Sequence, residues 1–115
     1  MKRTNILFVC SQNQWRSPTA EAIYRDDERV SARSRGTTQA AVQPIRSSDI
    51  VWADVILVME NKHRQRILAQ FPAEMKFKPM HVLDIPDDYR FMDAELIEWL
   101  KSATEPIINE ILKQT

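Results

Sequence analysis

Short runs of consecutive apolar residues alternate along this chain with segments whose apolar residues recur at helical spacing. An unbroken apolar run is typical of a strand covered on both faces of a parallel sheet, and a helix is the usual connection between two such strands. The runs that predict strands lie at residues 5–9, 29–33, 55–58 and 80–83, of which the second is the weakest. We therefore predict an α/β fold of the flavodoxin-like type, with three αβα layers and a four-stranded parallel doubly wound sheet.

Between and after these strands, helices are predicted at about 18–27, 47–52 and 61–70, and from residue 93 onward. Ser17 is expected to cap the first helix, with Pro18 in its first turn. Pro106 interrupts the last segment. It must either kink one long helix or begin a second helix that is capped near Thr104.

The remaining segments are predicted to be turns and loops. Gly36 is the only glycine and favours a turn at Ser34–Thr37, while residues 38–46 show no periodicity. Residues 84–91 form a polar loop that contains three aspartates. Ligands bind doubly wound sheets at the carboxyl ends of the strands, and both Cys10 and this aspartate loop follow a strand. We expect them to lie at the same edge of the sheet.

Composition limits the class of protein. The 115 residues are predicted to form one domain, 1–115, and 43% of them are apolar, as in a globular protein with a core. The formal net charge is zero, so we expect neither nucleic acid nor a membrane as a partner. Local basic segments occur at 29–35 and 62–66. Each is either an ordinary solvated face or a basic rim that attracts an anionic substrate.

The chain has a single cysteine, which rules out an intrachain disulfide and a cysteine-built metal site. We expect a protein without metal or other cofactor, in a reducing compartment. The apolar run after Met1–Arg3 is too short for a signal peptide, and no stretch is long enough to span a membrane. These features predict a cytoplasmic protein.

The segment Val9–Pro18 carries the candidate chemistry. A buried strand delivers the thiol of Cys10 into a short loop, which ends at Arg16 where a helix is about to begin. Unpaired N–H groups and the dipole of a helix N-terminus form an anion site, and with a nearby arginine they favour thiolate over thiol. A nucleophile inside such a cradle is the minimum equipment for displacement at phosphorus. The alternative is that Cys10 is an inert buried thiol.

Together with other segments, this loop resembles the low-molecular-weight protein tyrosine phosphatases. The matching segments appear in the family's order: Val9–Ala22, Ser34–Thr37, Ala53–Glu60 and Pro86–Tyr89, the last of which is similar to the family's acid loop. They span nearly the whole chain, which looks like a short bacterial branch of the family. The resemblance implies a metal-free phosphomonoester hydrolase that acts on a phosphorylated protein or an aryl phosphate. It also implies phosphate, sulfate or vanadate as ligands of the site.

The resemblance implies catalytic roles for individual residues. Cys10 attacks phosphorus and becomes a cysteinyl-phosphate, while Arg16 holds two equatorial oxygens in bidentate fashion. Ser17 donates a hydrogen bond to the Cys10 sulfur and helps to expel it. Asp87 is the general acid and then the base towards water. Asp88 is the alternative acid, although the family usually has proline there.

It also implies binding roles. Backbone N–H groups from Ser11 to Arg16 complete the phosphate cradle, and Asn13 braces the loop, from a left-handed backbone conformation that asparagine tolerates. Ser34 hydrogen-bonds this asparagine. Tyr89 either lines the pocket and stacks on an aryl substrate or is a partly buried loop residue. His63 and His81 are interpreted as structural.

Three loop residues depart from the family pattern. Gln12 stands where the family usually has glycine, which costs about 1 kcal/mol or more if that backbone needs a positive φ. Trp15 replaces a second cysteine, so Cys10 has no neighbouring thiol as a resolving partner. The ring of Trp15 either packs inside the protein or forms a wall at the mouth of the pocket. Gln14 is polar at a position that helps to set substrate preference in the family.

Two classes of function stay open. The first is the cysteine-dependent phosphatase, and the second is a catalytically weak phosphate- or phosphoprotein-binding module, whose geometry Gln12 and Trp15 have spoiled. An arsenate reductase of the same fold would need further cysteines to relay electrons. A sulfurtransferase would not need an acid at Asp87.

Overall fold

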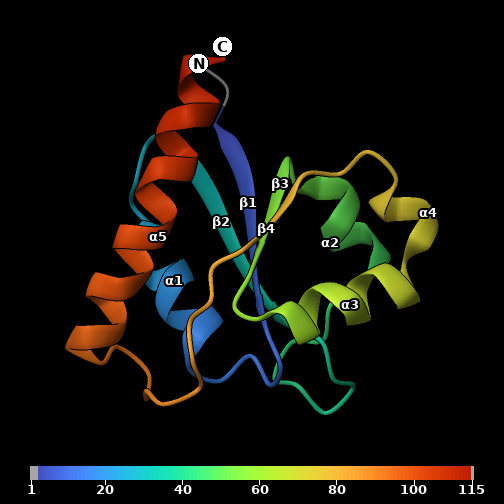
Figure 1. Ribbon diagram of the computed structural model, residues 1–115, viewed down its shortest axis with the longest axis horizontal. Helices are drawn as coiled ribbons and strands as arrows, with labels where there is room; N and C mark the ends of the chain where they lie inside the picture. The colour runs from blue at the N-terminus through green and yellow to red at the C-terminus, as the bar shows by residue number, and fades with distance from the viewer. Residues whose placement is uncertain (1–2, 115) are drawn as a thin grey trace.

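The computed structural model describes residues 3–114. Its strands β1 (Thr4–Cys10), β2 (Val30–Gly36), β3 (Val55–Val58) and β4 (Met80–Val82) form one parallel sheet in the order β2-β1-β3-β4. The helices are α1 (Arg16–Tyr24), α2 (Ser47–Trp52), α3 (Asn61–Gln70), α4 (Pro72–Met75) and α5 (Ala94–Lys113). Helices α1 and α5 cover one face of the sheet, and α2, α3 and α4 cover the other (Figure 1). The predicted three-layer fold with a four-stranded parallel doubly wound sheet is confirmed.

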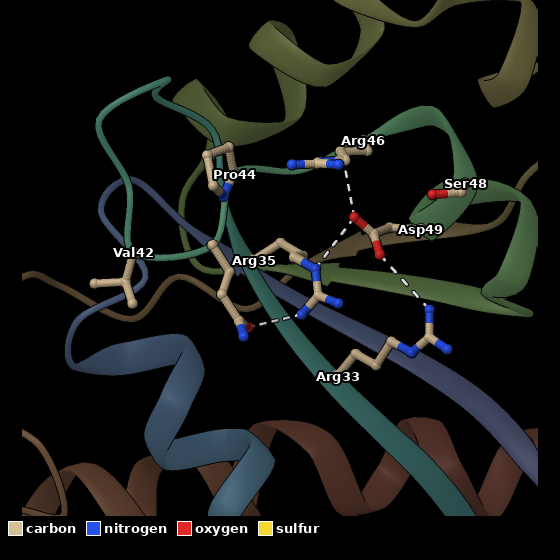
Figure 2. A pocket seen from close by; sticks show the side chains of 8 residues that line it. Arg33, Arg35, Val42, Pro44, Arg46, Ser48 and Asp49 are labelled. Carbon is tan, nitrogen blue, oxygen red and sulfur yellow. Dashed lines mark hydrogen bonds and ion pairs between the residues drawn. The ribbon is translucent and has the colours of Figure 1, made fainter.

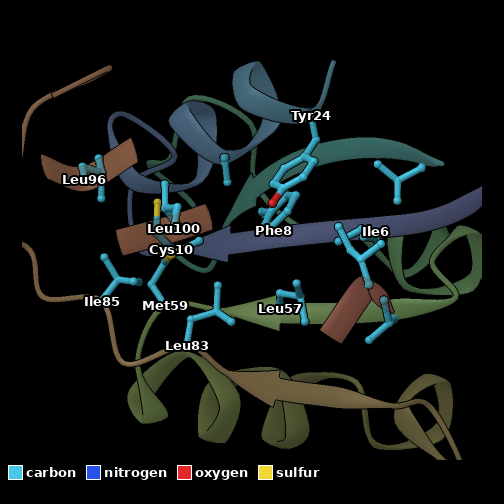
Figure 3. Packing of buried hydrophobic residues seen from close by; sticks show 14 residues of the cluster. Ile6, Phe8, Cys10, Tyr24, Leu57, Met59, Leu83, Ile85, Leu96 and Leu100 are labelled. Carbon is cyan, nitrogen blue, oxygen red and sulfur yellow. The ribbon is translucent and has the colours of Figure 1, made fainter. Parts of the chain in front are cut away.

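Two apolar clusters hold the three layers together. Ile6 and Phe8 of β1 belong to the cluster beneath α1 and α5, which also contains Cys10 at the end of the strand (Figure 3). Leu7 and Val9 belong to the cluster beneath α2 and α3. These four apolar residues of β1 are fully buried. Burial on both faces is the reason that this strand appears in the sequence as an unbroken apolar run.

The second strand is longer than predicted, and the predicted turn at Ser34–Thr37 is wrong. The last three residues of β2 pair with the end of β1, and the chain turns only after Gly36. This glycine has no positive φ. It is required because a Cβ there would lie 2.4 Å from the Ala41 Cβ and 2.6 Å from the Ser11 carbonyl oxygen. Glycine therefore lets the loop 37–46 pack against the loop that follows Cys10.

The first helix is shifted towards the N-terminus relative to the prediction. Its N-cap position is Trp15, so Ser17 lies inside the first turn and the prediction that it caps the helix is wrong. The Ser17 hydroxyl is engaged in the candidate site instead. At the other end the helix stops at Tyr24, and the Asp27 N–H donates to the Tyr24 carbonyl at 3.2 Å.

Pro106 lies inside one continuous helix, α5, so the predicted alternative of a second helix capped near Thr104 is wrong. The side chain of Asp93 caps this helix by accepting from two backbone N–H groups of its first turn.

The bounds of α2, β3 and α3 agree with the prediction, whereas the short helix α4 was not predicted and begins at Pro72. None of the helices within residues 3–114 combines the length and apolar character that a membrane crossing requires.

Candidate active site

Three loops meet at the carboxyl end of the sheet. The loop after β1, the loop 37–46 after β2 and the aspartate loop after β4 all lie at the lower edge of the molecule in Figure 1. Cys10 and the aspartate loop therefore share one edge of the sheet, as the strand order requires. The candidate site is built from this edge.

Cys10 is 3% exposed, and its thiol contacts Ser17. The Cys10 Sγ lies 3.0 Å from the Ser17 Oγ, and the Asn13 Nδ2 donates to the same oxygen at 3.0 Å. Because the amide occupies one lone pair of that oxygen, the hydroxyl proton of Ser17 is available to the sulfur, as a thiolate requires. The competing acceptor, the carbonyl of Arg35, is farther away at 3.4 Å. Asn13 has the left-handed φ of 55° expected for it.

The loop between β1 and α1 presents free backbone donors. Within residues 3–114, none of the N–H groups of Ser11 to Trp15 donates to a protein acceptor. They precede the N-terminus of α1, whose dipole adds positive potential, so the loop has the features of an anion-binding site. Gln12 is not among the residues with positive φ. The strain considered for a non-glycine residue there does not arise.

Arg16 is 2% exposed, and one side of its guanidinium is anchored. Its Nη1 donates to the Glu60 Oε2 at 2.6 Å and to the Ile85 carbonyl at 2.8 Å, while its Nε lies 3.6 Å from the Asp87 Oδ1. No hydrogen bond from Nη2 occurs within the described chain, so the Nε–Nη2 edge is available to a bidentate anion. Burial alone would raise the pKa of Glu60, but the hydrogen bond and charge of Arg16 outweigh it and lower that pKa.

A small pocket of about 50 Å³ brings these groups together. Its lining residues are Cys10, Ser11, Gln12, Gln14, Trp15, Arg16 and Asp87. Of the two carboxylates considered as the acid, Asp87 lines this pocket and pairs with Arg16, whereas Asp88 is exposed outside it. The geometry thus favours Asp87. Trp15, 41% exposed, forms part of the wall.

His63, which is interpreted from the sequence as structural, is buried and also contacts the loop after β1. The backbone N–H of Glu60 donates to the His63 Nδ1 at 3.0 Å, so the ring proton lies on Nε2, which donates to the Ser11 Oγ at 2.9 Å. Burial, with the positive charge of Arg16, lowers the pKa of His63 to about 4. The imidazole is therefore a neutral donor that holds one wall of the pocket. His81, by contrast, is exposed on the edge strand β4.

Glu60 and His63 are the two residues of the site that sequence reasoning missed. Both follow β3, which pairs directly with β1. The rule that ligands gather at the carboxyl ends of neighbouring parallel strands applies to β3 as much as to β1. Applied there, it points to the segment that begins at Glu60.

The buried neutral imidazole predicts that stability falls in acid. The pKa of His63 is about 4 in the folded chain and near its usual 6.5 in the unfolded chain. Between these values the unfolded chain binds more protons. The stabilising contribution is therefore complete above pH 6.5 and is lost as the pH falls towards 4, by about 3 kcal/mol in total. Denaturant unfolding at pH 7, 5.5 and 4.5 should show a smaller decrease for His63→Gln than for the wild type. Equal decreases would contradict this role.

Two residues that the resemblance places at the site lie elsewhere. Tyr89 does not line the pocket. Its ring packs edge-on against Trp99 of α5 with ring centroids 6.2 Å apart, which supports its alternative as a partly buried loop residue. The Ser34 hydroxyl donates to the Glu21 Oε1 at 2.8 Å, so the expected bond to Asn13 is wrong. A carboxylate is the stronger acceptor, and it lies on the facing helix α1.

Metal-binding side chains are not grouped in this region. Among residues 3–114, no set of three or more His, Cys, Asp and Glu side chains is placed to hold a metal ion. The positive charge at the pocket is that of Arg16, with the backbone N–H groups beside it.

Solved phosphatases share this fold over almost the whole chain. A low-molecular-weight phosphotyrosine phosphatase from Vibrio cholerae O395 is 24% identical, with a TM-score of 0.77 and coverage of 96% of this chain and 98% of that chain. The YwlE arginine phosphatase from Geobacillus stearothermophilus is 22% identical, with a TM-score of 0.76 and coverage of 96% and 94%. The tyrosine phosphatase Wzb from Escherichia coli K30, solved with phosphate, is 21% identical, with a TM-score of 0.75 and coverage of 95% and 99%.

No family model matches the chain, and no curated protein matches it significantly in sequence. The structural likeness nevertheless covers 96% of this chain for two of these phosphatases. At identities below 25% such a likeness establishes a common fold. This chain has the fold of the low-molecular-weight phosphotyrosine phosphatases.

Proposed function

We propose that this protein is a cysteine-dependent protein tyrosine phosphatase that hydrolyses phosphomonoesters through a cysteinyl-phosphate, without a metal or cofactor. The observation that carries the proposal is the 3.0 Å contact between the Cys10 Sγ and the Ser17 Oγ, beside a pocket that Cys10 shares with Arg16 and Asp87. A phosphate-binding module needs neither a hydrogen-bonded thiol nor a carboxylate in its pocket. Since Cys10 must stay reduced, a reducing compartment such as the cytoplasm suits this chemistry.

In the first step the Cys10 thiolate attacks phosphorus. The S–P bond forms while the P–O bond to the leaving group breaks, and Asp87 transfers its proton to the departing oxygen. The free edge of Arg16 and the N–H groups of Ser11 to Trp15 hold the equatorial oxygens, where charge is concentrated in the transition state. Glu60 keeps Arg16 in the required orientation.

In the second step water attacks the phosphorus of the cysteinyl-phosphate. Asp87, now ionised, takes a proton from the water as the O–P bond forms and the S–P bond breaks. The sulfur leaves as a thiolate, which the hydroxyl of Ser17 stabilises while Asn13 holds that hydroxyl in place. Inorganic phosphate is released, and the enzyme regains its starting state.

The pocket wall bears on the kind of substrate. Trp15 is half-exposed beside Cys10 and offers an aromatic surface to the ring of a phosphotyrosine. Proteins of this fold include phosphatases described as acting on tyrosine and on arginine. An aromatic wall favours the aryl phosphate. Peptides with phosphotyrosine and phosphoarginine in the same sequence compare the two directly.

The decisive experiment combines turnover with trapping of the intermediate. Wild-type protein is incubated with para-nitrophenyl phosphate in EDTA and a reductant between pH 5 and 7, and samples quenched in acid are analysed by mass spectrometry. We expect steady hydrolysis, unchanged by EDTA, and a covalent phosphate on Cys10. Phosphate binding without hydrolysis in a folded, reduced protein would replace the proposal with a phosphate-binding module.

Removal of the acid should harm poor leaving groups most. Asp87→Ala is expected to lower kcat about 10²- to 10³-fold for alkyl phosphates, whose oxygen needs a proton, and about tenfold or less for para-nitrophenyl phosphate. Asp88→Ala is the matched control, because it removes a neighbouring carboxylate that lies outside the pocket. Equal losses for both classes of ester, or a larger loss in Asp88→Ala, would assign the acid elsewhere.

A further inference from the structure

A cluster of arginines surrounds one buried carboxylate beside the candidate active site. Arg33 and Arg35 lie two residues apart on the edge strand β2, so their side chains share one face of the sheet, the face that α2 covers. They point towards Asp49 of that helix (Figure 2). The Arg35 Nε lies 3.1 Å and the Arg33 Nη1 lies 3.6 Å from carboxylate oxygens of Asp49, which is 4% exposed.

Together these residues carry more positive charge than the buried carboxylate needs. They line a cavity of about 540 Å³, whose ionisable side chains are three arginines and one aspartate, a formal net charge of +2. The third arginine, Arg46, is exposed and has no ion pair within residues 3–114. One arginine would neutralise Asp49. The surplus is therefore not explained by the packing of α2 on the sheet.

Two of the arginines are fixed in position. The Arg35 Nη1 donates to the Ser34 carbonyl at 2.6 Å and to the Gln43 Oε1 at 2.8 Å. The Arg33 guanidinium lies 4.1 Å from the centre of the Trp52 ring, in a cation–π contact. Positively charged groups held in this way lose little conformational entropy when an anion binds.

The arginine cavity lies near the candidate active site, with a second cavity between them. Val42 and Gln43 line both this cavity and a second one of about 620 Å³. That second cavity is also lined by Gln14 and Trp15, which belong to the pocket of Cys10. The bridging loop is tied to the catalytic loop, because the Val42 N–H donates to the Gln12 carbonyl at 3.0 Å.

Charge is distributed unequally on the two sides of the pocket. On the side of the aspartate loop, the exposed carboxylates of Asp87, Asp88 and Asp93 outnumber the one exposed cation there, Arg90. The arginine cavity lies beyond Val42 and Gln43, on the side of the loop 37–46. A polypeptide with negative side chains near its phosphorylated residue is repelled by the first side and attracted by the second.

We propose that Arg33, Arg35 and Arg46 form a second anion site, which binds an acidic side chain of the substrate polypeptide while its phosphorylated residue lies at Cys10. This inference rests on the proposed phosphatase function and names its substrates as phosphoproteins with a carboxylate or second phosphate close in sequence to the reacting residue. A carboxylate oxygen pair accepts two parallel N–H bonds from a guanidinium. The intervening cavity accommodates the residues between the two anions.

The test is a positional scan with phosphotyrosine peptides. One aspartate is placed in turn at each position up to eight residues on either side of the phosphotyrosine, and kcat/KM is divided by that of the matched asparagine peptide. In the wild type we expect at least one position at which this ratio reaches about five to ten. In Arg46→Gln the ratio should fall towards one. The double variant Arg33→Gln/Arg46→Gln should remove any remaining preference for aspartate. Arg66→Gln, an exposed arginine of α3 outside these cavities, should keep the wild-type ratio.

Several results would overturn the second site. A ratio near one at every position in a wild type that hydrolyses the asparagine peptides would do so, as would an aspartate preference that survives in the double variant. A ratio that falls equally in Arg66→Gln would indicate only a general positive field. Charge reversal adds a check, because Arg46→Glu changes the formal charge of the cavity from +2 to zero and should remove the aspartate preference that Arg46→Gln only weakens.

Failure of the proposed function gives a different signature. If the wild type hydrolyses neither para-nitrophenyl phosphate nor any peptide, the phosphatase proposal fails. Binding of the same peptides to wild type and to Arg46→Gln, measured by isothermal titration calorimetry, then decides the second site independently. Tighter binding of one aspartate peptide to the wild type alone supports it, and equal binding of aspartate and asparagine peptides overturns it.

Discussion

Cys10→Ser is expected to abolish turnover while phosphate still binds. A serine hydroxyl ionises far less readily than a thiol, so the variant has no nucleophile at neutral pH, and kcat should fall by about 10⁴-fold or more. The groups that would hold the phosphate, Arg16 and the free N–H groups of Ser11 to Trp15, do not depend on the sulfur. The dissociation constant for inorganic phosphate should therefore change by less than about threefold.

Selective labelling provides an independent reading of the same site. Cys10 is the only cysteine of the chain, so alkylation of the native protein reports on this one thiol. We expect iodoacetate to inactivate the enzyme in proportion to the thiol modified, and inorganic phosphate to slow the reaction. Thermal unfolding of Cys10→Ser checks that the variant is folded. A folded serine variant that keeps more than about 1% of the wild-type kcat would assign the nucleophile to another residue.

The parts of the fold that could be predicted are those whose burial is uniform. Residues 6–9 and 55–58 are covered on both faces, and their apolar runs locate β1 and β3 directly. The strand β2 lies at the edge and is only partly buried, and four of its seven residues are polar. Gly36 is compatible with a turn and with a close approach between backbones. Only the packing of Ala41 and Ser11 against it decides between them.

The candidate site divides in the same way into local and distant parts. Cys10, Asn13, Arg16 and Ser17 lie within eight consecutive residues, so their chemistry could be inferred from one stretch of sequence. Glu60 and His63 reach the same loop from 44 and 52 residues away. Their contacts depend on the pairing of β1 with β3, which no local pattern specifies. The sequence left two interpretations of Tyr89 open for a similar reason, because its packing against Trp99 depends on the course of α5.

Arg16→Lys should lower kcat by about 10³-fold with a smaller change in KM, because an ammonium cannot replace a guanidinium here. The guanidinium binds Glu60 and the Ile85 carbonyl through Nη1 and still has the Nε–Nη2 edge for two phosphate oxygens. A lysine has one nitrogen for both tasks. We expect it to pair with Glu60 and to leave the transition state without the bidentate contact, which is worth more there than in the ground state.

The pairing with Glu60 can be tested by combining substitutions. In the wild type, Glu60→Gln removes the charge that orients Arg16, and kcat should fall about tenfold. In the Arg16→Lys background the same change frees the ammonium from its carboxylate, so kcat should rise or stay constant. This opposite response is a coupling that two independent sites would not show. If Glu60→Gln lowers kcat by the same factor in both backgrounds, Glu60 acts by a route other than Arg16, and the anchored guanidinium is not the basis of phosphate recognition.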